Sequence, residues 1–208
     1  MISSPLYAIL DMDVLKSRGV RLRKVAVGLR AAGVSLIQYR NKTGTTQEVL
    51  AGAATLREVF AGVVCRLILN DHAELVSAAH FHGVHLGQTD LPVREARPLI
   101  GTASLIGLST HTDDQVRAAD LTSADYIAIG PVFPTATKLN AEPAVGLEGV
   151  RRARTLTTKP LVAIGGITRE NARSVLQAGA NSVAVISALF APGESVEKVA
   201  RDFLDILR

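Results

Sequence analysis

The sequence has a single cysteine, few aromatic residues and no apolar run long enough to span a membrane. Its 208 residues include one cysteine, Cys65, and no tryptophan, and aromatic residues make up 4%. A single cysteine excludes an internal disulfide, and its place before a strand-like run favours core packing. No run approaches the roughly 18 apolar residues that a membrane span needs. Met1–Pro5 lack the basic and apolar segments of a signal peptide, so we expect a cytoplasmic protein.

The positive charge of the chain is scattered rather than concentrated. The net charge is +4 and the pI about 9.5, which raises the question of nucleic-acid binding. Lys and Arg recur at helical spacings among apolar residues, as they do on solvated helix faces. Few aromatic side chains are available to stack on bases. We therefore expect small anionic ligands rather than nucleic acid or a membrane. A regulatory barrel that binds a phosphorylated ligand is kept as an alternative.

Short apolar runs alternate with amphipathic stretches along the whole chain. The expected strands are residues 6–10, 34–40, 67–70, 83–86, 104–108, 125–129, 161–164 and 182–186. The expected helices are residues 22–32, 46–60, 73–79, a helix after Pro92, 113–119, 147–155, a helix begun by Thr168, and 196–207. Thr45 or Thr46 is the expected N-cap of the second helix.

Eight strand–helix units predict a closed barrel. Near-continuous apolar strands followed by helices are typical of a parallel sheet covered on both faces. Eight units in 208 residues fit a single-domain α/β fold, a (β/α)₈ TIM barrel over residues 1–208. An open doubly wound sheet is the alternative, although no Gly-x-Gly-x-x-Gly turn follows the first strand.

Polar residues gather where the expected strands end, while the helix-to-strand turns carry fewer of them. The strand ends carry Asp11, Gln38, Arg40, Lys42, Asn70, Asp71, Gln88, Asp90, Ser109, Gly165, Gly166 and Ser187. Active sites of barrel enzymes lie at this carboxyl rim. The asymmetry predicts a ligand site there.

The segment Gln38–Lys42 ends the second expected strand. Side chains alternate along a strand, so Gln38, Arg40 and Lys42 are expected to face the ligand, with Tyr39 and Asn41 packed outward. An amide and two cations are costly to bury without an anionic partner. The alternative is a frayed, solvated strand end.

Two carboxylates, Asp71 and Asp90, follow the third and fourth expected strands. Neighbouring carboxylates repel unless a cation or a proton lies between them. Mg²⁺ is suitable, because it commonly uses one or two carboxylates together with phosphate oxygens and water. Helix capping by Asp71 and turn formation by Asp90 are the alternatives.

Glycines and hydroxyls follow the last three expected strands. Gly165-Gly166 and Ser187 stand where many barrels hold a phosphate, and glycine lets an anion approach the backbone N–H groups. A tight turn is the alternative. The segment Pro131–Lys138 opens the longest loop, which ends near Gly146, and its side chains Thr135, Thr137 and Lys138 suit a phosphorylated ligand. A mobile surface loop is the alternative there.

The histidines are weaker candidates. His80, His82 and His85 have the spacing of a metal cluster, but they span a helix end and a strand, so their rings should diverge. We interpret them as surface or core residues. His111 lies near the rim and is kept only as a supporting residue.

Two separate anion sites imply two anionic ligands. A diphosphate would be held by Mg²⁺ with Arg40, Lys42 and Lys138, and a monophosphate by Gly166 and Ser187. Loss of pyrophosphate from the first ligand and attack by the second is the reaction that this arrangement favours. Catalysis would consist of positioning and charge stabilisation at the leaving group.

The sequence resembles the thiamine phosphate synthase (thiamine-phosphate pyrophosphorylase) family over essentially its full length. The motifs that carry the resemblance are Leu6–Ile9, Gln38–Lys42, Asn70-Asp71, Gly83–Asp90, Gly130–Lys138, Ala163–Ile167 and Val185–Ser187. The resemblance implies a (β/α)₈ barrel that joins hydroxymethylpyrimidine diphosphate to hydroxyethylthiazole phosphate with Mg²⁺ and releases pyrophosphate. It also implies that pyrophosphate leaves before the pyrimidine cation is captured, so no general base is required.

The resemblance also implies a role for each matching residue. Asp71 and Asp90 would hold Mg²⁺. The residues that would contact the pyrimidine diphosphate are Gln38, Arg40, Lys42, Asn70, Ser109 and Lys138, of which Arg40, Lys42 and Lys138 would be catalytic. The residues that would hold the thiazole phosphate are Thr135, Thr137, Gly166, Ile186 and Ser187. The departures are His72 after Asp71 and Leu139 after Lys138, and neither removes a predicted ligand contact.

Other readings remain open. A thiazole tautomerase branch shares the fold but loses much of the diphosphate and metal set, which is intact here. A Schiff-base aldolase needs a desolvated lysine on a barrel strand, and only Lys42 ends a strand. The family suggests a homodimer, for which the sequence offers no obvious apolar stripe.

Overall fold

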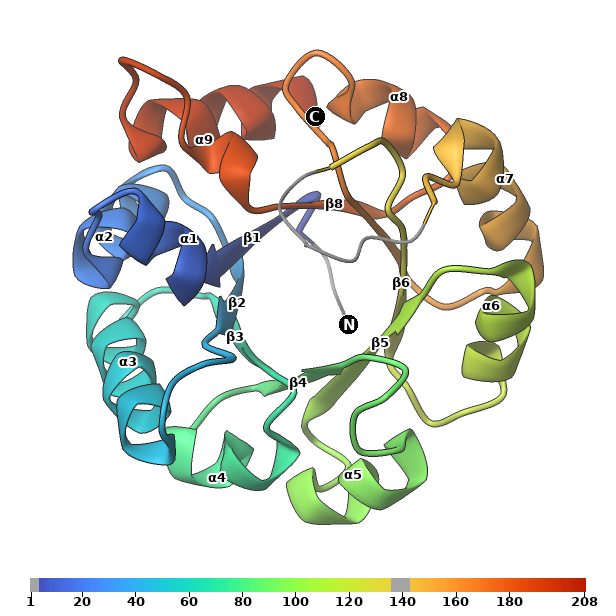
Figure 1. Cartoon of the computed structure of the whole chain (residues 1–208), viewed down its shortest axis with the longest axis horizontal. Helices are drawn as coiled ribbons and strands as arrows, with labels where there is room; N and C mark the ends of the chain where they lie inside the picture. The colour runs from blue at the N-terminus through green and yellow to red at the C-terminus, as the bar shows by residue number, and fades with distance from the viewer. Residues whose placement is uncertain (1–3, 136–142) are drawn as a thin grey trace.

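The structure is a computed structural model that describes residues 4–135 and 143–208. Eight parallel strands form one closed barrel in the order β1 to β8, and helices surround it (Figure 1). The strands are β1 (Leu6–Asp11), β2 (Leu36–Arg40), β3 (Arg66–Asn70), β4 (Gly83–Leu86), β5 (Leu105–Thr110), β6 (Tyr126–Ile129), β7 (Leu161–Ile164) and β8 (Ser182–Val185). The predicted (β/α)₈ barrel is confirmed. The open-sheet alternative is wrong, because β1 pairs with β8.

The helices follow the strands in turn. They are α1 (Met12–Ser17), α2 (Leu22–Ala31), α3 (Thr46–Val59), η1 (Ala73–Leu75), α4 (Val76–Ala79), α5 (Val93–Ile100), α6 (Asp113–Asp120), α7 (Gly146–Leu156), α8 (Ala172–Gln177), η2 (Ser187–Leu189) and α9 (Val196–Ile206). The predicted cap at Thr45 is confirmed, since Thr45 and Glu48 form a capping box at the start of α3. Over the described ranges, none of these helices combines the length and the apolar character that crossing a membrane requires.

Three predicted boundaries differ from the structure by two residues or more. Strand β2 begins at Leu36 rather than Val34, because the Val34 N–H donates to the Leu29 carbonyl (3.0 Å) beyond the end of α2. Strand β5 continues to Thr110 and so contains Ser109. Helix α8 begins at Ala172 rather than Thr168, because the Thr168 N–H donates to Asn171 Oδ1 (2.8 Å) in a turn. Helix α1 was not predicted.

Alternation along the strands divides the core into two layers. Leu6, Ala8 and Leu10 of β1 belong to the large cluster between barrel and helices. Tyr7 and Ile9, which alternate with them, belong to a smaller cluster inside the barrel with Leu36, Ile68, Tyr126, Ala128, Val162 and Ala184. Side chains on one face of a strand therefore pack against the helices, and those on the other face fill the barrel interior. Those inside the barrel form the floor beneath its carboxyl rim.

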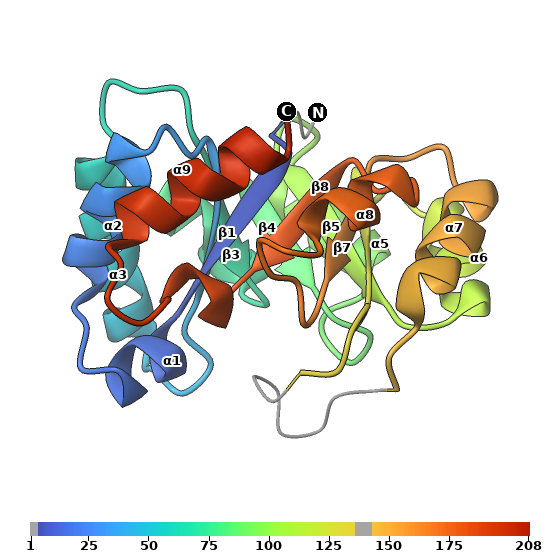
Figure 2. The same cartoon turned by 90° about the horizontal axis from the view of Figure 1, so that it is seen from above.

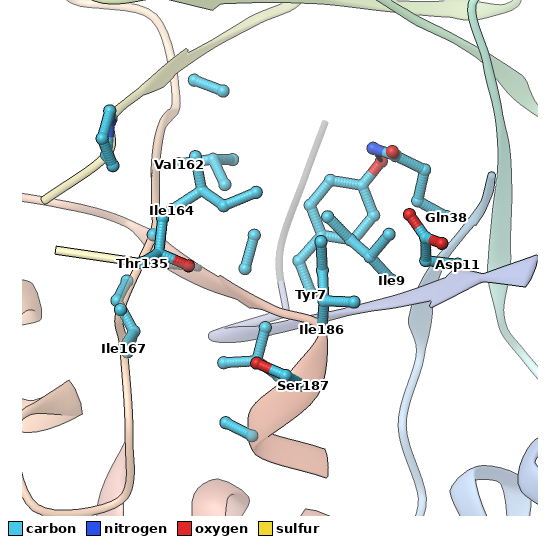
Figure 3. Close-up of a pocket in the computed structure, with 18 of the residues that line it drawn as sticks. Tyr7, Ile9, Asp11, Gln38, Thr135, Val162, Ile164, Ile167, Ile186 and Ser187 are labelled. Atoms are coloured by element: carbon cyan, nitrogen blue, oxygen red, sulfur yellow. Dashed lines mark hydrogen bonds between the residues drawn. The ribbon is translucent and has the colours of Figure 1, made fainter. Parts of the chain in front are cut away.

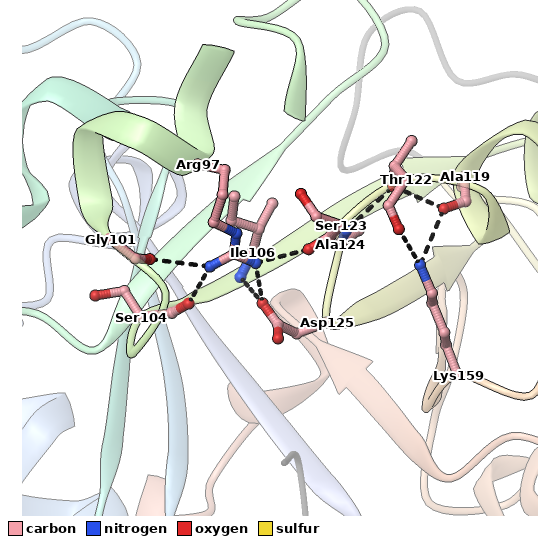
Figure 4. Close-up of polar contacts among 10 residues, drawn as sticks. All are labelled: Arg97, Gly101, Ser104, Ile106, Ala119, Thr122, Ser123, Ala124, Asp125 and Lys159. Carbon is pink, nitrogen blue, oxygen red and sulfur yellow. Dashed lines mark hydrogen bonds and ion pairs between the residues drawn. The ribbon is translucent and has the colours of Figure 1, made fainter. Parts of the chain in front are cut away.

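Polar side chains at the other end of the barrel stabilise turns. Arg97 of α5 donates to the carbonyls of Ser104 and Ser123 and to Asp125, and Asp125 accepts from the Ile106 N–H (Figure 4). Close by, the Lys159 ammonium donates to the Thr122 carbonyl (2.6 Å) and satisfies a carbonyl beyond the end of α6. In Figure 2, α1 lies toward the carboxyl rim and the C-terminus lies at the opposite end. These turn-stabilising contacts thus lie at the end of the barrel opposite to the carboxyl rim.

Candidate active site

A pocket of about 410 Å³ opens at the carboxyl rim of the barrel, within the size range of ligand sites, roughly 300–1,000 Å³. Predicted site residues that line it are Gln38, Arg40, Asn70, Ser109, Thr135, Gly166, Ile186 and Ser187. Its apolar wall consists of Ile9, Ala128, Val162, Ile164, Ile167 and Ala184. Figure 3 places Gln38 and Asp11 on one side of this pocket and Thr135 on the other. The pocket therefore has two polar ends separated by apolar surface.

The strand β2 side chains point as the alternation predicts. Gln38 and Arg40 line the pocket, and Gln38 is only 3% exposed. Tyr39 packs outward against α3, where a Cβ on Gly52 would lie 2.0 Å from the Tyr39 hydroxyl oxygen. Asn41 also points outward and donates to that hydroxyl (3.4 Å).

Lys42 departs from the simple alternation. Strand β2 ends at Arg40, so Lys42 lies on the turn and is not among the residues that line the pocket. Its ammonium is 3.2 Å from Asp71 Oδ2. Lys42 therefore reaches Asp71 and not the pocket, so the expectation that it faces the pocket beside Gln38 and Arg40 is wrong for this side chain. Asp71 and Asp90 are not among the lining residues either.

Arg40 has a partner that sequence reasoning did not assign. Its guanidinium donates to Oδ2 of Asp11, and the two side chains are 17% and 5% exposed. Asp11 Oδ1 accepts from the N–H groups of Asp13 and Val14 and caps α1. One carboxylate therefore fixes both the start of a helix and the position of a pocket cation.

Asp71 and Asp90 lie together, as predicted from their neighbouring strands. Burial and the adjacent Asp90 carboxyl raise the pKa of Asp71, and Lys42 opposes this shift. Asp71 has a left-handed backbone (φ +65°), which costs free energy in a non-glycine residue and is typical of functional positions. His72, not Asp71, occupies the N-cap of η1, so helix capping does not account for Asp71. Asp90 does close a turn, because its Oδ2 accepts from the Gly87 N–H (2.6 Å).

The carboxylate pair fits a magnesium ion. Two adjacent carboxylates of which one has a raised pKa are a donor set that a divalent cation would stabilise. In residues 4–135 and 143–208, no three His, Cys, Asp or Glu side chains come together as a metal-binding group. A cation here would therefore depend on phosphate and water oxygens as well, which is the coordination that Mg²⁺ prefers.

Gly165 and Gly166 turn the chain sharply after β7. Their φ angles are +103° and +63°, a region that glycine tolerates best. A Cβ on Gly166 would lie 2.7 Å from the Phe133 Cβ and from the Pro134 carbonyl oxygen. The loop after β6 thus packs on this turn and brings Thr135 to the pocket, where Ile186 and Ser187 also lie.

Two predicted residues, Thr137 and Lys138, lie outside the described residues. The described ends of their loop are joined by hydrogen bonds. The Val145 N–H donates to the Pro131 carbonyl (2.8 Å) and the Gly146 N–H to the Val132 carbonyl (3.0 Å). Both ends of the loop are therefore anchored beside the pocket.

Within the part of the chain that the structure describes, the histidines form no metal cluster. His82 Nδ1 accepts from the Leu67 N–H (3.0 Å). His85 is 8% exposed, and its ring nitrogens contact the Tyr126 hydroxyl (2.9 Å) and Ser109 Oγ (2.8 Å). His85 is therefore a core residue that also lines the pocket, whereas His82 is only half-buried. His111 lines it too and contacts the Gly130 carbonyl through Nδ1 (2.5 Å).

The family of this chain follows from comparison with known proteins. A family model described as thiamine monophosphate synthase matches residues 6–189. The chain belongs to the thiamine monophosphate synthase family. A thiamine-phosphate synthase of Koribacter versatilis (strain Ellin345) is 48% identical over 204 residues, which cover 97% of this chain and 95% of that protein. The thiamine-phosphate synthase of Chloroflexus aurantiacus is 39% identical over 94% of this chain and 89% of that protein.

A solved structure supports the same relationship. The thiamine phosphate pyrophosphorylase from Pyrococcus furiosus superposes with a TM-score of 0.86 at 32% identity, covering 99% of this chain and 96% of that one. Membership of the thiamine monophosphate synthase family is therefore supported by sequence and by fold over nearly the whole chain.

In this family member, the pocket is also lined by residues that were not predicted from the sequence. Arg18, the C-cap residue of α1, also lines it. The Arg18 guanidinium lies over the Phe190 ring (5.1 Å to its centroid) and donates to the Phe190 carbonyl (3.3 Å). Among the Lys and Arg side chains that line the pocket within the described ranges, Arg18 is the one without a carboxylate partner.

Tyr7 and Tyr126 were also missed, and His85 was interpreted only as a surface or core residue. Their polar tips meet inside the barrel, where the Tyr7 and Tyr126 hydroxyl oxygens are 3.0 Å apart. One sequence signal was available: each is an aromatic or imidazole residue with a polar tip inside an otherwise apolar strand, and such tips need partners when buried.

Proposed function

We propose that this protein is a thiamine-phosphate synthase. It joins hydroxymethylpyrimidine diphosphate to hydroxyethylthiazole phosphate and releases pyrophosphate. The observation that carries the proposal is the pocket with two unlike polar ends, one built around Arg40, Gln38 and Asn70 and the other around Gly166 and Ser187. The Asp71–Asp90 pair lies outside the residues that line this pocket, directly after Asn70 in the case of Asp71. The names of the similar proteins agree with the proposal.

Mg²⁺ is the cofactor that the donor set favours. Asp71 and Asp90 would hold it, with Lys42 beside them. When bound, the ion would neutralise charge on the diphosphate and on the departing pyrophosphate.

The diphosphate end works by fixing charges in place. Arg40 is held by Asp11 and presents its remaining N–H groups to the pocket. Asn70, Ser109 and Gln38 add polar groups at the same end, and Lys138 is the further cation that we propose there. Because these groups are preorganised, they stabilise the leaving pyrophosphate without reorganising as its charge develops.

The chemistry needs no proton transfer. The carbon–oxygen bond of the pyrimidine methylene breaks, and both electrons leave with pyrophosphate. The lone pair of the thiazole nitrogen then forms the new carbon–nitrogen bond. Ile9, Val162 and Ile164 line the space between the two polar ends, and this apolar surface would exclude water from the cation before capture.

The second substrate is held through its phosphate. Gly166, Ile186 and Ser187, with Thr135 and Thr137 from the loop after β6, are the residues that we propose for it. Arg18 adds the cation that this end otherwise lacks within the described residues. The contacts fix the thiazole so that its nitrogen faces the methylene carbon, which lowers the entropic cost of the reaction.

Product formation tests the proposal. Purified protein is incubated with both substrates and Mg²⁺, and thiamine phosphate and pyrophosphate are followed by chromatography. The two products are expected in equal amounts, and chelation of the metal should stop both. Absence of product with metal present would contradict the proposal.

The same experiment separates the remaining alternatives. A thiazole tautomerase would convert one thiazole phosphate isomer into another without the diphosphate, but this chain keeps the Asp71–Asp90 pair and Arg40. A regulatory barrel would bind the phosphates without turnover. The homodimer and the cytoplasmic location stay predictions, and sedimentation velocity tests the first.

A further inference from the structure

Five side chains from five strands form one hydrogen-bonded chain beneath the pocket. Gln38 Nε2 donates to the Tyr7 hydroxyl (3.0 Å), which meets the Tyr126 hydroxyl (3.0 Å). Tyr126 meets Nδ1 of His85 (2.9 Å), and Nε2 of His85 meets Ser109 Oγ (2.8 Å). Gln38, Tyr7, His85 and Ser109 line the pocket, whereas Tyr126 lies beneath it. The chain therefore runs from one pocket residue through the barrel interior to another.

The central tyrosine is held tightly. Tyr126 of β6 lies opposite Gly107 of β5 in the strand register, and a Cβ on Gly107 would be 2.0 Å from the Tyr126 Cζ. The His85 ring stacks on the Tyr126 ring, with centroids 5.5 Å apart. Burial raises the pKa of both Tyr7 and Tyr126, so both phenols stay protonated in neutral solution and act as donors as well as acceptors.

The donors and acceptors can be satisfied in one direction. Because Gln38 donates to the Tyr7 oxygen, the Tyr7 hydrogen is left to be donated to Tyr126. Tyr126 then donates to Nδ1 of His85, and the proton of the neutral ring resides on Nε2. The Nε2–H group donates to Ser109 Oγ. Reversal would leave the buried Tyr7 hydrogen facing an N–H donor, and an unpaired buried polar hydrogen is costly.

We propose that this chain is polarised from Gln38 to Ser109 and orients the Ser109 hydroxyl hydrogen toward the diphosphate. Since Ser109 Oγ accepts from His85, its own hydrogen is available to the ligand. Tyr126, Tyr7 and His85 are positioning residues for that contact, and successive hydrogen bonds strengthen one another. Gln38 and Ser109 are both proposed contacts of the same substrate, so the chain joins two ends of one ligand site. The expected effect on turnover rests on the proposed function, whereas the direction of the hydrogen bonds from Gln38 to Ser109 does not.

The tautomer of His85 tests the direction independently of activity. Histidine labelled with ¹⁵N is incorporated, and the His85 signals are assigned as those that disappear in the His85→Gln variant. We expect a neutral ring protonated at Nε2 with an unprotonated Nδ1. A ring protonated at Nδ1 would overturn the proposal, because Ser109 would then donate to His85 and Gln38 would turn its carbonyl toward Tyr7.

Removing the central hydroxyl tests the effect on the substrate. Tyr126→Phe should lower kcat/KM for the pyrimidine diphosphate by about tenfold or more and leave the KM for the thiazole phosphate within about twofold. Tyr39→Phe is the matched control, because its hydroxyl meets Asn41 outside the barrel interior. Equal effects of the two variants on kcat/KM, at comparable melting temperatures, would overturn the positioning role.

A double-variant comparison asks whether Tyr126 acts through Ser109. Tyr126→Phe is combined with Ser109→Ala, and the loss in kcat/KM is compared with the product of the two single losses. We expect Tyr126→Phe to add less than about twofold in the Ser109→Ala background. Independent, multiplicative losses would show that Tyr126 does not act through Ser109. If neither the wild-type protein nor any variant makes thiamine phosphate, the proposed function fails. The His85 tautomer still decides the direction of the hydrogen bonds in that case.

Discussion

Arg40 and Asp11 form an ion pair between neighbouring strands at the carboxyl rim. The guanidinium donates to Asp11 Oδ2, while Oδ1 caps helix α1. Both side chains are largely buried, so the pair loses more hydration than a surface pair and depends on good geometry. A capped helix and a cation aimed into the pocket therefore depend on the same carboxylate.

Arg40→Lys should impair turnover with the pyrimidine diphosphate. Lysine keeps the charge but has no planar set of donors that can contact Asp11 and a phosphate together. We expect kcat/KM to fall by about 10–100-fold, equivalent to about 1.4–2.7 kcal/mol of transition-state stabilisation. Steady-state kinetics measures this, with Arg94→Lys on the exposed face of α5 as the control. Unchanged kinetics would mean that Arg40 serves only to hold Asp11.

Asp71→Asn and Asp90→Asn should each raise the Mg²⁺ concentration needed for half-maximal activity. We expect an increase of about tenfold or more, because each variant removes an anionic ligand. Binding of the thiazole phosphate alone, followed by calorimetry, should change little. Asp114→Asn, whose side chain is 95% exposed on α6, is the control. Equal losses in metal dependence and in thiazole phosphate binding would disprove the separation of the two ends.

Arg18→Gln should weaken binding of the thiazole phosphate. Arg18 lines the pocket and donates to the carbonyl of Phe190, the residue after Ser187–Leu189. It has no carboxylate partner among the described residues, so its charge is available to the monophosphate. We expect its KM to rise about tenfold, with the pyrimidine diphosphate KM unchanged. The control is Arg21→Gln, since Arg21 is exposed and lies outside the pocket. If both KM values rise together, Arg18 acts by holding the Phe190 segment in place.

Arg169→Gln should destabilise the protein in a pH-dependent way. Hydrogen bonds from Arg169, with Lys198 beside it, lower the pKa of Glu194 from 4.5 to about 2. A lowered folded-state pKa adds stability that is fully present above the unfolded pKa and is lost as pH falls toward the folded value. The difference in melting temperature between wild type and variant should therefore be constant from pH 7 to about pH 5 and shrink below it. A constant difference down to pH 3 would exclude this linkage.

The fold could be predicted because the strands of a parallel barrel have a simple sequence pattern. Apolar runs such as Leu161–Ile164 are short, are bounded by turn residues and recur with helices between them, and the two faces of each strand differ little in polarity. The carboxyl-rim residues could be predicted because polar groups at strand ends contrast with plain turns at the other end. Asp71 and Asp90 meet for the same reason, since consecutive strands are neighbours in a closed barrel.

The missed residues depend on information that single segments do not carry. Tyr7 and Tyr126 are 119 positions apart and meet only because both point into a closed barrel. Asp11 was recognised as a rim residue, but its pairing with Arg40 depends on the register of β1 and β2, in which the two residues are partners. Arg18 was missed because α1 is six residues long, too short to show helical periodicity.

A crystal structure with the two products and Mg²⁺ tests the central claim most directly. The account predicts pyrophosphate at the end formed by Arg40 and Ser109, with the metal on Asp71 and Asp90, and the phosphate of thiamine phosphate at Gly166 and Ser187. Positions of the phosphorus atoms and the metal, found by anomalous or difference density, give the answer. Both phosphate groups at one end, or a metal away from the Asp71–Asp90 pair, would contradict the account.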